Sequence, residues 1–219
     1  MKFTAVAFDL DGTLYPDFRL YVRLVPFLLK ENRLLRAMGR ARNMLRKSGS
    51  YGRDFYETQF RLMGEILKEN AEKVREKTER LIYRGWEPLF MKIRLFPHVT
   101  ETLDAFRKEG IRMGILSDFP PEKKLENLKI SGYWDTVLCS ETVGRLKPDP
   151  ASFLELAGSM GMPPEQILYV GNSNSYDVEG ASMAGMKTAY IRSKWKKRSA
   201  GKADFVFYDY RQLRDYVLG

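Results

Sequence analysis

Cysteine and histidine are almost absent from this chain of 219 residues. Cys139 is the single cysteine, which excludes an intramolecular disulfide and a cysteine-cluster metal site. His98 is the single histidine, so a Ser-His-Asp triad or a histidine-rich zinc site would depend on it alone. The surrounding pattern predicts a packing role for Cys139, in an apolar strand, and a structural or solvent role for His98.

Long hydrophobic runs are also missing. No apolar run approaches the roughly 18 residues of a membrane helix. The apolar run at the N-terminus is interrupted by Asp9 and Asp11, which does not suit a secretory signal. We therefore expect a soluble, cytoplasmic protein without a membrane partner. The sequence does not indicate the oligomeric state, and a monomer is the default expectation.

Strand and helix signals alternate along most of the chain, which is typical of a parallel sheet covered by helices on both faces. The exception is a long helical stretch, from about 17 to 90, without a strand signal. We therefore predict an α/β fold with a Rossmann-like, doubly wound core (residues 1–14 and 95–219) and an inserted all-helical domain (residues 15–94). The predicted strands are 3–9, 111–116, 136–139, 167–170, 187–191 and 204–207, and the predicted core helices are 99–108, 121–129, 150–159, 176–184 and 209–217.

Positive charge is concentrated in the helical segment. Residues 15–95 hold 19 lysines and arginines against 10 acidic residues, whereas the rest of the chain holds 18 of each. The charge could attract small anionic substrates, serve a nucleic acid, which is the less favoured partner, or belong to a solvated helix surface. The first long helix is predicted to be especially basic, with Arg33, Arg36, Arg40, Arg42, Arg46 and Lys47.

Two aspartates one residue apart, Asp9 and Asp11, end the first apolar segment. Side chains at i and i+2 of a strand point the same way, so we expect both carboxylates to face one spot at the carboxyl edge of the sheet, with a cation between them. Ser117, Lys147 and the segment 171–177 lie at or near the carboxyl ends of later predicted strands.

These four segments together resemble the motifs of the haloacid dehalogenase-like (HAD) hydrolase superfamily. They are Asp9-Leu10-Asp11-Gly12-Thr13, then Ser117, Lys147 and the acidic Gly-x-Ser segment that ends at Asp177, in this order and at fitting spacing. The resemblance implies a phosphatase-type member with a helical cap, because the helical segment follows the first motif directly. Such a cap closes over the active site in this superfamily.

A phosphate monoester is a dianion, so a carboxylate nucleophile needs positive charge beside it, and Mg²⁺ with oxygen ligands meets that need. The resemblance implies that Asp9 attacks phosphorus and forms an aspartyl-phosphate, and that Asp11 acts as general acid and base. It also implies that Ser117 donates a hydrogen bond to the phosphoryl group and that Lys147 supplies fixed positive charge. The implied Mg²⁺ ligands are Asp9, Asp11, Asn172 and Asp177.

Asn172 departs from the family pattern, since phosphatase relatives usually carry aspartate after this glycine. The amide oxygen can still ligate Mg²⁺, but one negative charge is lost, so we expect weaker metal binding. The stretch from Ser173 to Asp177 also resembles the metal-free 2-haloacid dehalogenases, which lack an acid at the position of Asp11. That activity is the alternative function, and a catalytically weakened scaffold or nucleic-acid-binding protein is a third hypothesis.

The substrate is expected to be a small phosphate monoester, which the sequence does not specify further. Specificity in such enzymes is expected to come from cap residues that reach the site. The sequence offers only weak candidates for these contacts, namely Tyr15, Phe18 and Arg53.

Overall fold

The computed structural model describes residues 3–16, 22, 25, 27, 29–48, 54–91, 93–192 and 201–219. Its core is a six-stranded parallel sheet with the order β3-β2-β1-β4-β5-β6. β1 lies inside the sheet, where Ala5 is in register with Arg112 on one side and with Ile167 on the other. The strands are β1 (Ala5–Phe8), β2 (Arg112–Ser117), β3 (Thr136–Cys139), β4 (Ile167–Gly171), β5 (Lys187–Ile191) and β6 (Phe205–Phe207).

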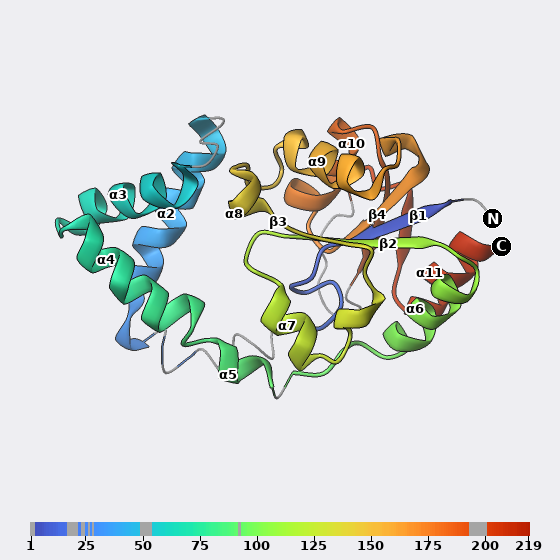
Figure 1. Cartoon of the computed structure of the whole chain (residues 1–219), viewed down its shortest axis with the longest axis horizontal. Coiled ribbons are helices and arrows are strands. Elements are labelled where there is room, and N and C mark those ends of the chain that lie inside the picture. Colours follow the sequence, from blue (N-terminus) through green and yellow to red (C-terminus); the bar gives the residue numbers. More distant parts are fainter. Residues whose placement is uncertain are drawn as a thin grey trace.

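Helices cover both faces of the sheet, because successive strand residues present apolar side chains to opposite faces. Val6 and Phe8 pack on the side of α6 (Val99–Lys108), α7 (Glu122–Asn127) and α11 (Tyr210–Leu218). Ala5 and Ala7 pack on the side of α9 (Pro150–Met160) and α10 (Glu179–Met183). Figure 1 shows the two helical layers on opposite sides of the strands. The predicted α/β, Rossmann-like fold class is confirmed.

The described residues between β1 and α6 are mostly helical and have a hydrophobic cluster largely of their own. It contains α2 (Asn32–Ser48), α3 (Phe55–Leu67), α4 (Ala71–Thr78), a π-helical turn η2 (Glu79–Tyr83) and α5 (Glu87–Phe90). Figure 1 shows α2, α3 and α4 to one side of the sheet, with α8 (Ser140–Val143) between them and the core. The predicted apolar face of the first long helix is buried in this cluster through Leu34, Met38, Ala41 and Leu45.

The predicted elements agree with the structure with small shifts at their ends. β3 and α6 have the predicted bounds, whereas β1 ends at Phe8, one residue earlier than predicted. The predicted helix 176–184 begins earlier, with a π-helical turn η5 (Asn174–Val178) that leads into α10. Cys139 is buried as expected. None of the described helices is both long enough and apolar enough to cross a membrane.

Candidate active site

Asp9 is the first residue after β1, and its side chain lies at the carboxyl edge of the sheet with only 6% exposure. Its N–H donates to the Val170 carbonyl at 2.9 Å, which ties this position to β4. Lys147 Nζ donates to Asp9 Oδ1 at 2.7 Å, and Thr13 Oγ1 donates to Asp9 Oδ2 at 2.7 Å. The Asp9 carboxylate is therefore held in one orientation by a positive charge and a hydroxyl group.

Lys147 links Asp9 to a second buried carboxylate, that of Asp177. Lys147 Nζ donates to Asp177 Oδ1 at 2.7 Å. The other Asp177 oxygen accepts from the backbone N–H groups of Asn172 and Ser173, at 3.1 and 2.9 Å. Direct metal ligation by Asp177 stays a prediction, because the contacts of its two oxygens in the structure are with three protein donors.

Two residues of β4, Gly171 and Tyr169, help to position Lys147 and its partner Asp177. A Cβ atom at Gly171 would lie 2.3 Å from the Cβ of Asp177, so a larger residue would displace Asp177 from Lys147. The Tyr169 hydroxyl accepts from Lys147 Nζ at 3.3 Å and donates to the Leu116 carbonyl at 3.1 Å. Glycine at the end of β4 thus allows the close packing of the site.

Asp11 lies beyond the end of β1, in the loop that follows this strand. β1 ends at Phe8, and the chain turns through Gly12, which has a φ of 86° that favours glycine. The Asp11 carboxylate consequently contacts Lys124, whose Nζ lies 2.6 Å from Oδ2 and 2.9 Å from Oδ1, and it also accepts from the Tyr15 hydroxyl. The two aspartates are therefore paired with two different lysines, and a cation between them stays a prediction.

Ser117 ends β2, next to β1, and is fully buried. Its Oγ accepts from the Phe119 N–H at 3.3 Å, which leaves the hydroxyl proton able to donate to a ligand. Asp118 follows directly, and its Oδ1 accepts from the Lys147 N–H at 3.1 Å. β2 therefore supplies both a hydroxyl group and an anchor for the backbone of Lys147.

The charges of the site are strongly coupled because they are buried. Burial raises the pKa of Asp9 to about 7, against the attraction of Lys147. Burial alone would lower the pKa of Lys147, but Asp177 and Asp9 hold it well above its usual range. Burial would likewise raise the pKa of Asp118, but Lys147 and nearby arginines hold it below its usual range. One lysine shared by the Asp9 and Asp177 carboxylates leaves a net negative charge, which favours a further cation.

Oxygen atoms suited to a hard cation meet beside Asp11. The Asn172 side-chain nitrogen donates to the Asp11 carbonyl at 3.2 Å. Rotation of the amide by half a turn would place its oxygen there, and two oxygens about 3 Å apart suit neighbouring positions around Mg²⁺. Within the described part of the chain, no three His, Cys, Asp or Glu side chains form a metal-binding group. The predicted cation ligands Asp9, Asp11, Asn172 and Asp177 stay a prediction.

Two arginines of α2 reach from the helical segment to the core beside the site. Arg46 Nε donates to the Lys147 carbonyl at 2.9 Å, and its Nη2 donates to Asp118 Oδ2 at 2.8 Å. Arg42 Nη2 donates to the Asp118 carbonyl at 2.8 Å, and its Nη1 pairs with the buried Glu141 carboxylate. The sequence interpretation counted both arginines only toward the charge of the helix, although their i, i+4 spacing places them on one face.

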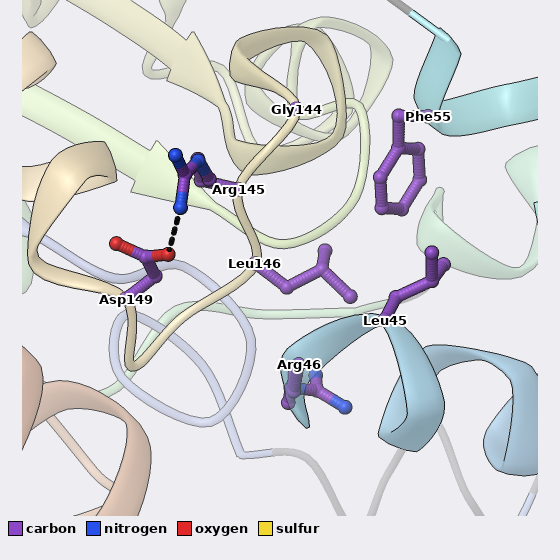
Figure 2. Close-up of a pocket in the computed structure, with 7 residues that line it drawn as sticks. All are labelled: Leu45, Arg46, Phe55, Gly144, Arg145, Leu146 and Asp149. Carbon is purple, nitrogen blue, oxygen red and sulfur yellow. Dashed lines mark hydrogen bonds and ion pairs between the residues drawn. The ribbon is translucent and has the colours of Figure 1, made fainter. Parts of the chain in front are cut away.

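Of the weaker candidates, Tyr15 contacts Asp11, whereas Phe18 and Arg53 lie outside the described residues. Figure 2 shows a small pocket where α2 and α3 meet the loop before Lys147. None of the predicted site residues lines this pocket, although Arg46, which donates to the Lys147 carbonyl, does. Its lining residues are Leu45, Arg46, Phe55, Gly144, Arg145, Leu146 and Asp149.

Known proteins similar to this chain include hydrolases. A family model described as haloacid dehalogenase-like hydrolase matches residues 3–185. The phosphoglycolate phosphatase of Escherichia coli (strain K12) is 30% identical over 198 residues, which cover 82% of this chain and 77% of that protein. The phosphoglycolate phosphatase of Salmonella typhimurium (strain LT2) has the same identity and coverage.

Solved structures give the same result. A HAD phosphatase from Thermococcus onnurineus is 26% identical, with a TM-score of 0.67 over 99% of this chain and 98% of that chain. A 2-haloacid dehalogenase from Pseudomonas syringae pv. Tomato DC3000 has a TM-score of 0.67 over 98% of both chains, and at 21% identity this likeness concerns the fold alone. Since the family model spans most of the sequence and the relatives cover four fifths of it, the chain belongs to the haloacid dehalogenase-like hydrolase family.

Proposed function

We propose that this protein is a Mg²⁺-dependent phosphatase that hydrolyses small phosphate monoesters through an aspartyl-phosphate on Asp9. The observation that carries the proposal is the arrangement around Asp9, where a buried carboxylate lies 2.7 Å from Lys147 and a second acid, Asp11, follows two residues later. A buried, oriented carboxylate beside a fixed positive charge suits attack on an anionic phosphorus centre.

The contacts of each supporting residue suit a specific chemical role. Thr13 and Lys147 fix the orientation of the attacking Asp9 carboxylate. Ser117 donates its hydroxyl proton to a phosphoryl oxygen, since its Oγ already accepts from a backbone N–H. Asp11 gives a proton to the leaving oxygen and then takes one from the water that hydrolyses the intermediate. Its 31% exposed side chain gives it access to solvent.

The donor set fits Mg²⁺, which when bound would supply positive charge to offset that of the phosphate dianion. Asp9, the Asp11 carbonyl, the Asn172 amide and Asp177 would hold the ion. Lys147 and the Asn172 N–H hold the Asp177 carboxylate in place. Because Asn172 is neutral, the ion is held by fewer charges than a set with aspartate there would supply.

The helical residues 15–94 form the proposed cap, and residues 1–14 and 95–219 form the proposed core. The separate hydrophobic cluster of α2, α3 and α4, and the contacts of Arg42 and Arg46 beside the site, support this division. The name of the relatives makes phosphoglycolate the first substrate to test. A cytoplasmic location stays a prediction.

Phosphate release from 4-nitrophenyl phosphate and from phosphoglycolate, measured across a Mg²⁺ titration, tests the proposal. We expect release that requires Mg²⁺ and that falls more than about a thousandfold in Asp9→Asn, because the nucleophile is removed. The Asp9→Asn protein, purified in the same way, is also the control for a contaminating phosphatase. Activity that survives this substitution would reject the proposal.

Metal-independent 2-haloacid dehalogenase activity is the second candidate. The resembling segment includes Asn174, but its side-chain amide donates to Glu179 at 2.8 Å. The acid Asp11, which a dehalogenase does not require, is present. Halide release from 2-chloropropionate without Mg²⁺, together with no phosphate release, would favour the dehalogenase. No turnover of either kind and a salt-sensitive gel shift would favour a binding protein.

A further inference from the structure

The Asp11 carboxylate has its own buried lysine, separate from the lysine that serves Asp9. Lys124 Nζ lies 2.6 Å from Asp11 Oδ2 and 2.9 Å from Asp11 Oδ1. The partners of Lys147 Nζ are instead Asp9, Asp177 and Tyr169. The site therefore contains two buried lysines, one that contacts Asp9 and Asp177 and one that contacts Asp11.

Lys124 is placed for this contact by α7, a short helix that follows the Ser117 strand. It is only 7% exposed, and burying an ammonium group is costly unless it is paired and hydrogen-bonded. The rings of Phe90 and Phe119 flank it, with their centroids 5.1 and 5.6 Å from Nζ. Its neighbour Lys123 lies on the exposed side and pairs with Glu126 at 2.9 Å. Of these two adjacent lysines, Lys124 therefore contacts Asp11 and Lys123 contacts Glu126.

We propose that Lys124 is a positioning residue that fixes the Asp11 carboxyl group, which takes up a proton from solvent through its 31% exposed side chain and passes it to the leaving oxygen. The two-pronged contact restricts rotation of the carboxyl group, and the Tyr15 hydroxyl contacts the same carboxylate. This inference deepens the proposed function and rests on it, because the role of Asp11 is part of that function. Lys124 acts through Asp11 and does not touch the phosphoryl group.

Comparing substrates with different leaving groups distinguishes positioning of Asp11 from a merely structural role of Lys124. A structural role would affect the rates of both substrates alike. The nitrophenolate of 4-nitrophenyl phosphate needs little help from a proton donor, whereas the alkoxide of phosphoglycolate, or of another alkyl phosphate turned over by the wild type, needs it strongly. We expect Lys124→Met to lower kcat for the alkyl phosphate by roughly tenfold to a hundredfold, with little change in KM. Single-turnover release of nitrophenolate should change far less.

Two comparisons connect the effect to Asp11. Adding Lys124→Met to Asp11→Asn should not change the ratio of the alkyl and aryl rates further, since the group that Lys124 positions is already lost. Lys124→Arg should recover part of the alkyl phosphate activity. Lys123→Met on the exposed side of the same helix should leave both rates unchanged.

Equal losses for the two substrates, or no loss for either, would overturn the inference. So would a further change of the ratio in the Asp11→Asn background. If Lys124→Met does not fold, as judged by thermal unfolding, Lys124→Gln serves the same test because it keeps a hydrogen-bond donor without the charge. A wild-type protein without phosphatase activity would reject the proposed function itself, which separates the two failures.

Discussion

Asn172 lies where a carboxylate would add charge to the oxygen donors beside Asp11. Its side chain is 3.2 Å from the Asp11 carbonyl, and its backbone N–H donates to Asp177. Affinity for Mg²⁺ rises with the number of charged ligands. We therefore expect Asn172→Asp to tighten Mg²⁺ binding by roughly tenfold, as measured by isothermal titration calorimetry without substrate.

Asn127→Asp is the matched control for this substitution, because it adds one carboxylate on α7 instead of at the site. Its Mg²⁺ affinity should equal that of the wild type. Unchanged affinity in Asn172→Asp would show that Asn172 is not a ligand.

The motif residues of the site could be predicted from the sequence, whereas their supporting partners could not. Asp9, Ser117, Lys147 and Asn172 follow or approach strand ends, and the parallel sheet brings strand ends to one edge. Lys124 lies 113 residues from Asp11 along the chain, and nothing in its local sequence distinguishes it from Lys123. Side-chain partners at such separations depend on how the helices pack, which the local pattern does not contain.

On the scale of elements, α2 has two basic faces with different surroundings. Arg33, Arg36, Arg40 and Lys47 are exposed, whereas Arg42 is buried and Arg46 is nearly so. The carboxylate that receives Arg42 belongs to Glu141 in α8, which is only 1% exposed. Tyr56 and Tyr83 also donate to this carboxylate, at 3.0 and 2.9 Å. Three side chains of the helical segment thus hold one carboxylate of the core.

Removing the positive partner should leave the Glu141 carboxylate buried without a counter-charge. We expect Arg42→Met to lower the free energy of unfolding by about 3–5 kcal/mol, measured by urea denaturation. Arg40→Met, on the exposed face of the same helix, should change it by less than about 0.5 kcal/mol. The double variant Arg42→Met/Glu141→Gln should lose less than the sum of the single losses. Additive losses would contradict a direct coupling of these residues.

Asp204 directly precedes β6, the edge strand, and its side chain forms hydrogen bonds with residues of β5. Its carboxylate accepts from the N–H and hydroxyl of Thr188, at 2.9 and 3.0 Å, and from Lys187 Nζ at 2.9 Å. Burial alone would raise the pKa of Asp204, but these hydrogen bonds hold it below its usual value. The carboxylate therefore stabilises the fold above the ordinary aspartate pKa of about 3.9, and this contribution is lost as the pH falls through the lowered pKa.

Asp204→Asn should accordingly be less stable than the wild type by about 1 kcal/mol at neutral pH. The difference should shrink when unfolding is followed at decreasing pH below about 4. Asp215→Asn, at an exposed position of α11, should show no such pH-dependent difference. A stability difference for Asp204→Asn that is constant with pH would contradict the role of its charge.

Element boundaries were predictable where apolar periodicity reflects burial, as in β3 and α6. They were less predictable where side chains bond to the backbone. At the start of η5, the N–H groups of Asp177 and Val178 both donate to the Ser173 carbonyl, at 3.0 and 3.1 Å. A π-helical turn of this kind depends on those contacts and not on the periodicity of apolar residues.

On the scale of the whole molecule, the charge is divided unevenly between the helical segment and the rest. Residues 15–95 carry the entire net charge of +9. Such a field raises the local concentration of anionic substrates and is screened by salt. We expect kcat/KM for a phosphate monoester to fall by roughly tenfold as ionic strength rises from low to above physiological values, with kcat nearly unchanged.

Substitution of the exposed arginines of α2 tests whether the helical segment causes the salt dependence of kcat/KM. Replacing Arg33, Arg36 and Arg40 by glutamine should weaken the salt dependence of kcat/KM, because all three are exposed and away from the buried contacts of Arg42. Glutamine substitutions at Lys108 and Lys129, which lie in the core segment and on exposed surface, should not weaken it. An unaltered salt dependence in the triple variant would contradict steering by α2.

The central position of β1 also constrains how the chain is made. β1 is synthesised first, but its partners in the sheet, β2 and β4, begin only at Arg112 and Ile167. The helices from α2 to η2 make mostly local contacts with one another, and such units fold quickly and early during synthesis. The apolar strand and the loop that carries Asp9 therefore have no partner strand in the sheet until β2 has also been translated. The first part of the site to be translated is among the last to be assembled.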